Sequence, residues 1–220
     1  MMDASETKRS SGARERILAA ATDLAGREGL ETLTTRRVAK EARVNVGLLH
    51  YYFDSKESLI DETLGLFLEE MLAEAEARWQ LGVADSLEDR LTELLVGSLE
   101  RASGKPGLIF GLLARLLAAV AEAARTGKGM GGGAEGETAL PLGAMAKMQA
   151  SLFEMMRPLL VARLGDTPEL VGRRAIQLLT STFHPALFTP LPGIIFGIDL
   201  RDEDMRRDYV RAIVVDALRP

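Results

Sequence analysis

Apolar residues recur every three or four positions along most of this 220-residue chain, and this spacing restricts its fold more than any other feature. Aromatic residues make up only 5% of the sequence, and no long run alternates between apolar and polar residues as a strand would. The chain is 47% hydrophobic and 27% charged, which is enough apolar surface for a sizeable core and excludes a disordered protein. We therefore predict an all-α protein.

The composition also excludes several classes of protein. There is no cysteine, so disulfide frameworks, thiol catalysis and cysteine metal sites are ruled out. The polar start, residues 3–11, predicts that there is no signal peptide. The longest apolar stretch, residues 106–121, is interrupted by Arg115 and is predicted to be too short and too charged for a membrane span. These features predict a cytoplasmic chain that has no membrane partner.

Three regions follow from the pattern. Residues 1–12 are polar and are predicted to be a disordered tail, and residues 13–56 are predicted to form a small three-helix domain. Its helices are expected at 13–27, 34–42 and 45–52, with Thr34 and Asn45 as N-caps. Leu49 and Phe53, four residues apart, are expected to pack in its core.

Residues 57–220 are predicted to form a six-helix bundle for ligand binding and dimerisation. Asp54 is expected to cap a long helix that runs to about residue 81, and Pro158 is expected to kink a later one. Residues 126–138 hold six glycines and are predicted to be a flexible loop, and residues 184–198 are expected to be irregular. The other helices are expected at about 86–102, 108–124, 140–164, 168–183 and 203–218.

The second and third short helices have the spacing of a helix-turn-helix, in which the second helix enters the DNA major groove and the first crosses the phosphate backbone. The charge distribution agrees with this, because residues 1–56 carry 10 Lys and Arg against 8 Asp and Glu, a net charge of +2, whereas the remainder has −7. A helix pair alone is weak evidence for a DNA-binding motif, but the residues themselves are more specific. The informative stretches are Arg16-Ile17-Leu18-Ala19-Ala20-Ala21, Gly29, Leu33-Thr34-Thr35-Arg36-Arg37-Val38-Ala39, Val44-Asn45-Val46-Gly47-Leu48-Leu49-His50-Tyr51-Tyr52-Phe53 and Ser55-Lys56-Glu57-Ser58-Leu59.

With their spacing intact, these stretches resemble the DNA-binding domain of the tetracycline-repressor (TetR) family. The resemblance implies a homodimeric transcriptional regulator, usually a repressor, that a small molecule releases from DNA. The chain departs from the family pattern at three positions. Arg43 replaces the usual glycine of the turn, His50 replaces a tyrosine, and Leu48 replaces a small polar residue.

The expected DNA contacts lie at the ends of these helices. Thr34 and Thr35, at a helix N-terminus, favour a phosphate, and the resemblance places Arg36 at the groove edge, where it could bind guanine. Arg37 and Lys40 could contact DNA or form only a solvated helix face. The remaining predicted contacts are Asn45, Val46, Gly47 and Leu48 with base edges, and His50, Tyr51, Tyr52 and Lys56 with phosphates or base acceptors.

A small-molecule pocket is expected between helices of the second domain, mostly apolar with a few polar anchors. Its predicted lining is Phe110, Arg115, Met145, Met148, Phe153, Met156 and His184. The apolar members could equally be core. Arg115 could be paired, extend to solvent or face an anionic ligand, and His184 could cap carbonyls. Trp79 could cover a pocket or an interface.

Dimerisation is predicted through residues 168–183 and 203–218, two helices from each subunit forming a four-helix bundle. The apolar candidates are Leu178, Leu179, Ile213, Val214 and Leu218, with the partner also covering residues 187–198. An activator or a ligand-independent regulator is the alternative. An enzyme is disfavoured because there are two His, no Cys, no phosphate-binding loop and no cofactor motif. The acidic bulk of the chain argues against a nonspecific architectural DNA binder.

Overall fold

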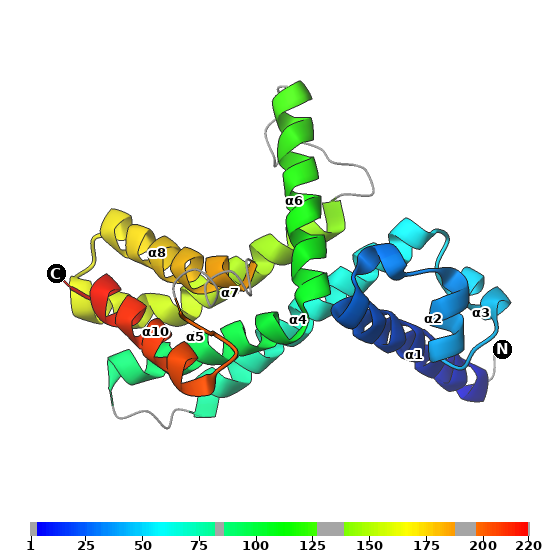
Figure 1. Ribbon diagram of the computed structural model, residues 1–220, viewed down its shortest axis with the longest axis horizontal. Coiled ribbons are helices and arrows are strands. Elements are labelled where there is room, and N and C mark those ends of the chain that lie inside the picture. Colours follow the sequence, from blue (N-terminus) through cyan, green and yellow to red (C-terminus); the bar gives the residue numbers. More distant parts are fainter. Residues whose placement is uncertain (1–3, 82–85, 127–138, 188–196, 220) are drawn as a thin grey trace. The chain divides into compact units, whose positions relative to one another are not determined.

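The computed structural model describes residues 4–81, 86–126, 139–187 and 197–219, and within these ranges all regular structure is helical. A 3-10 turn, η1 (Leu30–Thr32), lies between the first two α-helices (Figure 1). The α-helices are α1 (Ala4–Glu28), α2 (Thr35–Glu41), α3 (Val46–Tyr52), α4 (Lys56–Leu81), α5 (Leu87–Gly104), α6 (Pro106–Thr126), α7 (Ala139–Leu164), α8 (Pro168–Leu187) and α10 (Glu203–Ala217). The predicted all-α fold is confirmed.

The chain folds into two compact units. The first contains residues 1–69 and 105–145, and the second contains residues 70–104 and 146–220. The first unit extends beyond the predicted boundary at residue 56, because it also contains α4 up to Glu69, α6 and the start of α7. We call them the DNA-side unit and the bundle unit.

The core of the DNA-side unit lies where α1, α2 and α3 meet. Ile17 from α1 and Val38 from α2 are completely buried, and Leu49 and Phe53 are each 1% exposed. The prediction that Leu49 and Phe53 belong to the core is confirmed. Helix α1 begins at Ala4, so most of the segment predicted to be a disordered tail continues this helix.

The backbone of helix α6 packs closely against the end of α1. A Cβ atom added at Gly107 would lie 2.1 Å from the carbonyl oxygen of Ala25, so only glycine fits against this last turn of α1. One turn further along α6, a Cβ at Gly111 would meet the side chain of Leu30. The first turns of α6 therefore complete the DNA-side unit.

A buried ion pair joins α6 to α4 in the same unit. Asp61 of α4 is 2% exposed, and its Oδ1 lies 3.1 Å from Nη1 of Arg115, whose side chain is 21% exposed. Of the alternatives that the sequence left open for Arg115, the structure selects pairing within the chain. An ion pair at such depth requires both partners, because either charge alone is costly to bury.

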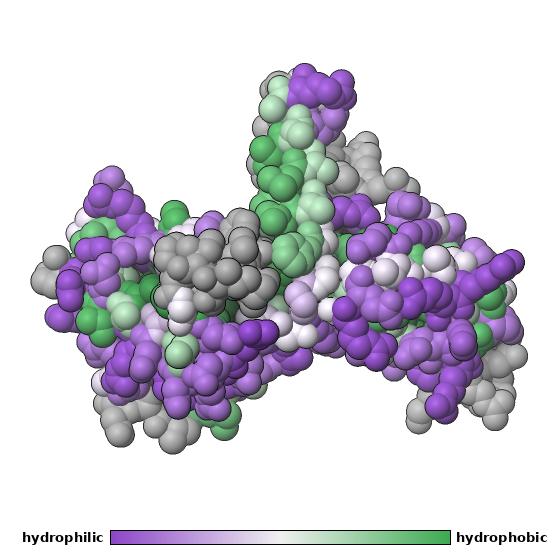
Figure 2. All heavy atoms as spheres, viewed as in Figure 1, coloured by the Kyte–Doolittle hydropathy of each residue, from purple (hydrophilic) through white to green (hydrophobic). Residues whose placement is uncertain are grey.

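Apolar side chains are exposed along much of α6. Phe110, Leu117 and Val120 are 49%, 59% and 43% exposed, and Figure 2 shows apolar side chains along the helix. We predicted this stretch to be too short for a membrane span. The helix extends to Thr126. Among the described helices it is the one that is long and apolar enough to cross a membrane, judged by length and composition alone. One such helix is weak evidence for a span, and its start packs on α1.

The bundle unit is built on α5, which packs against α8 and α10. Leu91, Leu95 and Leu99 along α5 are fully buried. Arg211 of α10 pairs with Asp89 at 2.7 Å, and Arg207 pairs with Glu93 one turn along. The three helices are thus held by an apolar seam with ion pairs at its edge.

Three residues predicted for the dimer interface lie in this core instead. Leu178 and Val214 are completely buried and Leu218 is 2% exposed within a single chain, so they are not available to a partner. Helical periodicity marks an apolar face but does not say whether that face packs within or between chains. The large apolar side chains that are exposed on the same helices are Ile176, Met205 and Val215.

Some predictions fall on other parts of the chain. Most of the glycine-rich loop, residues 127–138, and most of the irregular segment, residues 188–196, lie outside the described residues. Helix α8 continues to Leu187, beyond its predicted end, and α7 continues through Pro158.

Candidate nucleic-acid interface

The two short helices of the turn begin at the predicted caps. The hydroxyl oxygen of Thr34 accepts a hydrogen bond from the backbone N–H of Arg37 at 3.3 Å, which starts α2. Oδ1 of Asn45 accepts from the backbone N–H of Leu48 at 2.6 Å, which starts α3. Both oxygens are therefore occupied as acceptors, whereas the Thr34 hydroxyl and the Asn45 amide can still donate to DNA.

Helix α2 ends in a Schellman motif. The N–H of Val44 bonds the carbonyl of Ala39 at 2.9 Å, and the N–H of Arg43 bonds the carbonyl of Lys40 at 3.2 Å. The motif places Arg43 in the left-handed region, with φ at 56°. Glycine usually occupies this position because other residues crowd their own backbone there.

Helix α3 has one anchored face and one open face. Leu49 is buried in the core, whereas Gly47 and His50 are exposed and Tyr51 is 74% exposed. Val46 and Leu48, in the first turn, are half-buried. The rings of Tyr51 and Tyr52 meet edge to face with centroids 5.1 Å apart. The helix is thus held from one side and presents a row of polar and aromatic side chains on the other.

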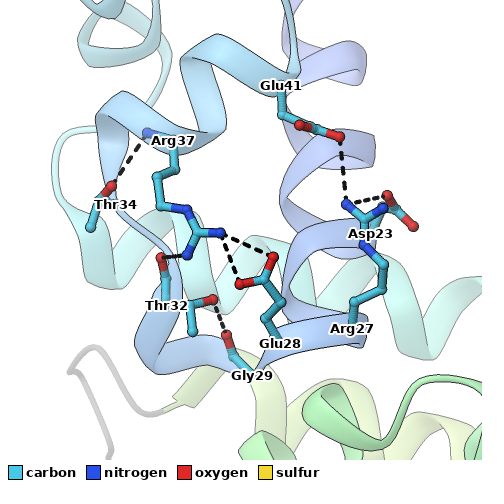
Figure 3. Close-up of polar contacts among 8 residues, drawn as sticks. All are labelled: Asp23, Arg27, Glu28, Gly29, Thr32, Thr34, Arg37 and Glu41. Atoms are coloured by element: carbon cyan, nitrogen blue, oxygen red, sulfur yellow. Dashed lines mark hydrogen bonds and ion pairs between the residues drawn. The ribbon is translucent and has the colours of Figure 1, made fainter.

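Figure 3 shows that Arg37 is tied to neighbouring backbone and to α1. Its Nη2 donates to both carboxylate oxygens of Glu28, at 3.0 and 2.8 Å, and its Nη1 donates to the carbonyl of Thr32 at 3.3 Å. The sequence left open a DNA contact or a solvated helix face for Arg37, and neither alternative included these bonds. A DNA contact by Arg37 would have to break them. Arg27 of α1 similarly pairs with Asp23 and Glu41.

The start of α4 corrects one predicted cap. The hydroxyl oxygen of Ser55 accepts from the backbone N–H of Ser58 at 2.9 Å, so Ser55, not Asp54, caps this helix. Both residues are good caps and only the backbone register separates them. Lys56 is the first helical residue and is half-buried.

Comparison with known proteins bears on this domain directly. The sequence model of the family described as "Bacterial regulatory proteins, tetR family" matches residues 17–63. The chain is 36% identical over 89 residues to the HTH-type transcriptional repressor KstR2 of Rhodococcus jostii, which covers 40% of this chain and 42% of the relative. It is 33% identical over 96 residues to the repressor KstR of Mycolicibacterium smegmatis, covering 44% and 46%. Residues 17–63 therefore match the DNA-binding domain of the TetR family.

Solved structures extend the likeness to the fold of the whole chain. A TetR-family regulator from Streptomyces coelicolor superposes with a TM-score of 0.67 at 16% identity, covering 98% of this chain and 80% of that one. FadR from Bacillus subtilis, solved in complex with stearoyl-CoA, gives 0.62 at 12% identity, covering 93% and 98%. At these identities the likeness shows the fold alone.

Both sequence relatives are described as transcriptional repressors, which agrees with the prediction of a regulator rather than an enzyme. The chain spans less than half the length of both relatives in these matches.

The residues predicted to bind an effector are divided between the two units. Phe110, Arg115 and Met145 belong to the DNA-side unit, and the other four belong to the bundle unit. Met156 is completely buried and His184 is exposed near the end of α8. Met145, Met148 and Phe153 are half-buried. Their role in ligand binding stays a prediction.

A different set of residues lines a cavity in the bundle unit. It has a volume of about 560 Å³, within the range of small-molecule sites, and lies among side chains of α4, α5 and α7. The guanidinium of Arg90 stacks over the ring of Trp79 at 4.3 Å and donates to the Trp79 carbonyl at 3.1 Å. The lining is Glu76, Trp79, Arg90, Ser151, Glu154, Met155, Pro158 and Leu159. Of these residues, Trp79 was predicted to cover either a pocket or an interface, and it lines this cavity. Apolar periodicity does not mark the lining as a whole, because half of its residues are polar.

Proposed function

We propose that this chain is a homodimeric transcriptional repressor that binds a palindromic operator and is released from it by an apolar or amphipathic small molecule. The observation that carries the proposal is the open face of α3. Gly47, His50 and Tyr51 point away from a core that anchors the helix through Leu49. In a helix-turn-helix this is the face that meets the major groove.

The chemistry of these positions suggests how bases are read. Val46 and Leu48 cannot hydrogen-bond and suit thymine methyl groups, and Gly47 allows the backbone to approach closely. Arg36, exposed on α2, suits a guanine at the groove edge. The other proposed contacts, mainly with phosphates, are Thr34, Thr35, Asn45, His50, Tyr51, Tyr52 and Lys56.

Dimerisation through α8 and α10 fits the exposed side chains of these helices. Ile176 of α8 is 64% exposed and Val215 of α10 is 41% exposed, and the two helices pack against each other. A two-fold pairing of such helices would form a four-helix bundle. It would allow two α3 helices to reach major-groove faces separated by roughly 34–36 Å.

The cavity beside Trp79 is the site we propose for the effector. Trp79, Met155 and Leu159 can hold an apolar chain, and Arg90 can bind an anionic head group. Helix α4 begins at Lys56 next to the turn and carries Trp79 near its other end. A ligand that moves this helix would change how the DNA-binding residues meet the operator.

The first test is footprinting of the purified protein on the DNA upstream of its own coding region. A protected inverted repeat, with each half-site covered by one subunit, is the expected result. Absence of protection there would call for selection from random duplexes. Failure to enrich any sequence in that selection would contradict the proposal.

The second test uses Trp79, which is the single tryptophan of the sequence. Saturated fatty acids and their coenzyme A thioesters that bind the cavity should change its fluorescence. They should also weaken operator binding about 5- to 150-fold, which corresponds to a coupling of about 1–3 kcal/mol. A Leu159→Asp variant should bind the operator normally but lose the response. Release from DNA without any change in Trp79 fluorescence would place the effector elsewhere.

A further inference from the structure

Three cations on and just after α2 are exposed and have no polar side-chain partner among the residues that the structure describes. They are Arg36, Lys40 and Arg43, which we call the cationic row. Arg36 and Lys40 are four residues apart and share one face of α2, and Arg43 follows in the turn. The neighbouring cation Arg37 lies on another face, where Glu28 neutralises it.

Nearby carboxylates are paired with other cations. Glu28 pairs with Arg37 at 2.8 Å, and Asp23 and Glu41 pair with Arg27 at 3.0 and 3.5 Å. Helix α3 contains neither lysine nor arginine. The unneutralised charge of the two-helix motif is therefore concentrated in the cationic row, where it would attract a polyanion.

The backbone at Arg43 is an independent observation. The residue occupies the left-handed position of the Schellman motif, with φ at 56°, where glycine is relaxed and most other residues are strained. An arginine here stabilises the turn less than glycine would. Strain of this kind persists at sites where the side chain has a use, and the exposed guanidinium of Arg43 is the group that this position provides.

We propose that Lys40 and Arg43 bind backbone phosphates of the operator, beside the groove that α3 enters, and extend the contact begun by Arg36. This inference rests on the proposed function. The first helix of a helix-turn-helix crosses the phosphate backbone, so cations on its outer face are suitably placed. The row supplies the electrostatic contribution to binding that α3, without lysine or arginine, cannot supply.

The experiment compares DNA affinity and thermal stability in the same variants. The probes are a duplex selected from random sequences by the wild-type protein and a scrambled duplex of equal length, each titrated at several salt concentrations. Arg43→Gly should bind both duplexes about tenfold more weakly, with a log–log salt slope smaller by about 0.9 per subunit. Its Tm should nevertheless rise by about 2–4 °C, because the strain is removed.

Three further variants separate charge from conformation. Arg43→Lys should keep most of the affinity, and Lys40→Gln should lose affinity without a rise in Tm. Lys147→Gln removes an exposed charge from α7 and should leave both measurements unchanged.

The results that would overturn the inference are distinct from failure of the proposed function. If Arg43→Gly binds with wild-type affinity and salt slope, the row is only a solvated surface. Loss of affinity for the selected duplex alone would indicate a base contact and reject the phosphate assignment. If the wild-type protein enriches no duplex at all, the proposed function itself is wrong, and the inference falls with it.

Discussion

Replacing Arg115 with methionine should lower the free energy of unfolding by about 3 kcal/mol. The guanidinium lies 3.1 Å from the carboxylate of Asp61, which is 2% exposed. Methionine fills similar space but removes the positive charge beside a carboxylate that is itself almost completely buried. Urea denaturation followed by circular dichroism measures the change directly.

A double variant distinguishes the loss of the pair from a loss of packing. Arg115→Met combined with Asp61→Leu removes both charges and should recover most of the lost stability, since apolar replacements of a buried ion pair are often neutral. The single variant Asp61→Leu leaves Arg115, which is 21% exposed, able to reach water and should cost less than Arg115→Met. Equal destabilisation in the single Arg115→Met variant and the double variant would contradict this account.

The turn and its caps could be predicted from the sequence because their signals are local. Thr34 and Asn45 each cap a helix through a bond three residues along the chain, and the spacing of Leu49 and Phe53 marks a buried face. The wrong prediction that Asp54 caps α4 also arises from relying on local signals. Two adjacent residues could both cap α4, and only the backbone conformation selects Ser55.

Contacts between distant segments could not be predicted in this way. The sequence marked Arg115 as unusual but did not identify its partner on α4. The spacing of residues along one sequence does not show which distant positions are in contact. The apolar faces of α8 and α10 posed the same problem. Their periodicity was correctly read as helical, but Leu178 and Val214 pack within the chain rather than against a partner.

The grouping of α6 with the helix-turn-helix was also missed, and Gly107 explains both the grouping and the difficulty. Its importance depends on the backbone of α1, some eighty positions earlier in the chain, and in the sequence it is only one glycine after a proline. A glycine within or near a helix is usually read as a weak helix former or a stop. Here it allows two helices to approach more closely than any side chain permits.

Replacing Gly107 with alanine should therefore destabilise the protein by about 2–3 kcal/mol, although alanine is the better helix former. The added Cβ would lie 2.1 Å from the carbonyl oxygen of Ala25 and 2.8 Å from the backbone nitrogen of Gly29. These two atoms are themselves hydrogen-bonded at 2.9 Å in the last turn of α1, so neither can move aside without breaking that bond. The helix α6 must shift instead.

A matched variant supplies the control. Gly65 lies within α4 in the same unit, and a Cβ added there meets no atom within 4 Å. Gly65→Ala should therefore stabilise the protein by up to about 1 kcal/mol through helix propensity alone. The two variants make the same chemical change but should shift the free energy of unfolding in opposite directions. The difference between their unfolding free energies, measured by urea denaturation, therefore isolates the contact between α6 and α1. If both variants are stabilising, α6 does not rest on α1 in solution, and the DNA-side unit ends before Lys105.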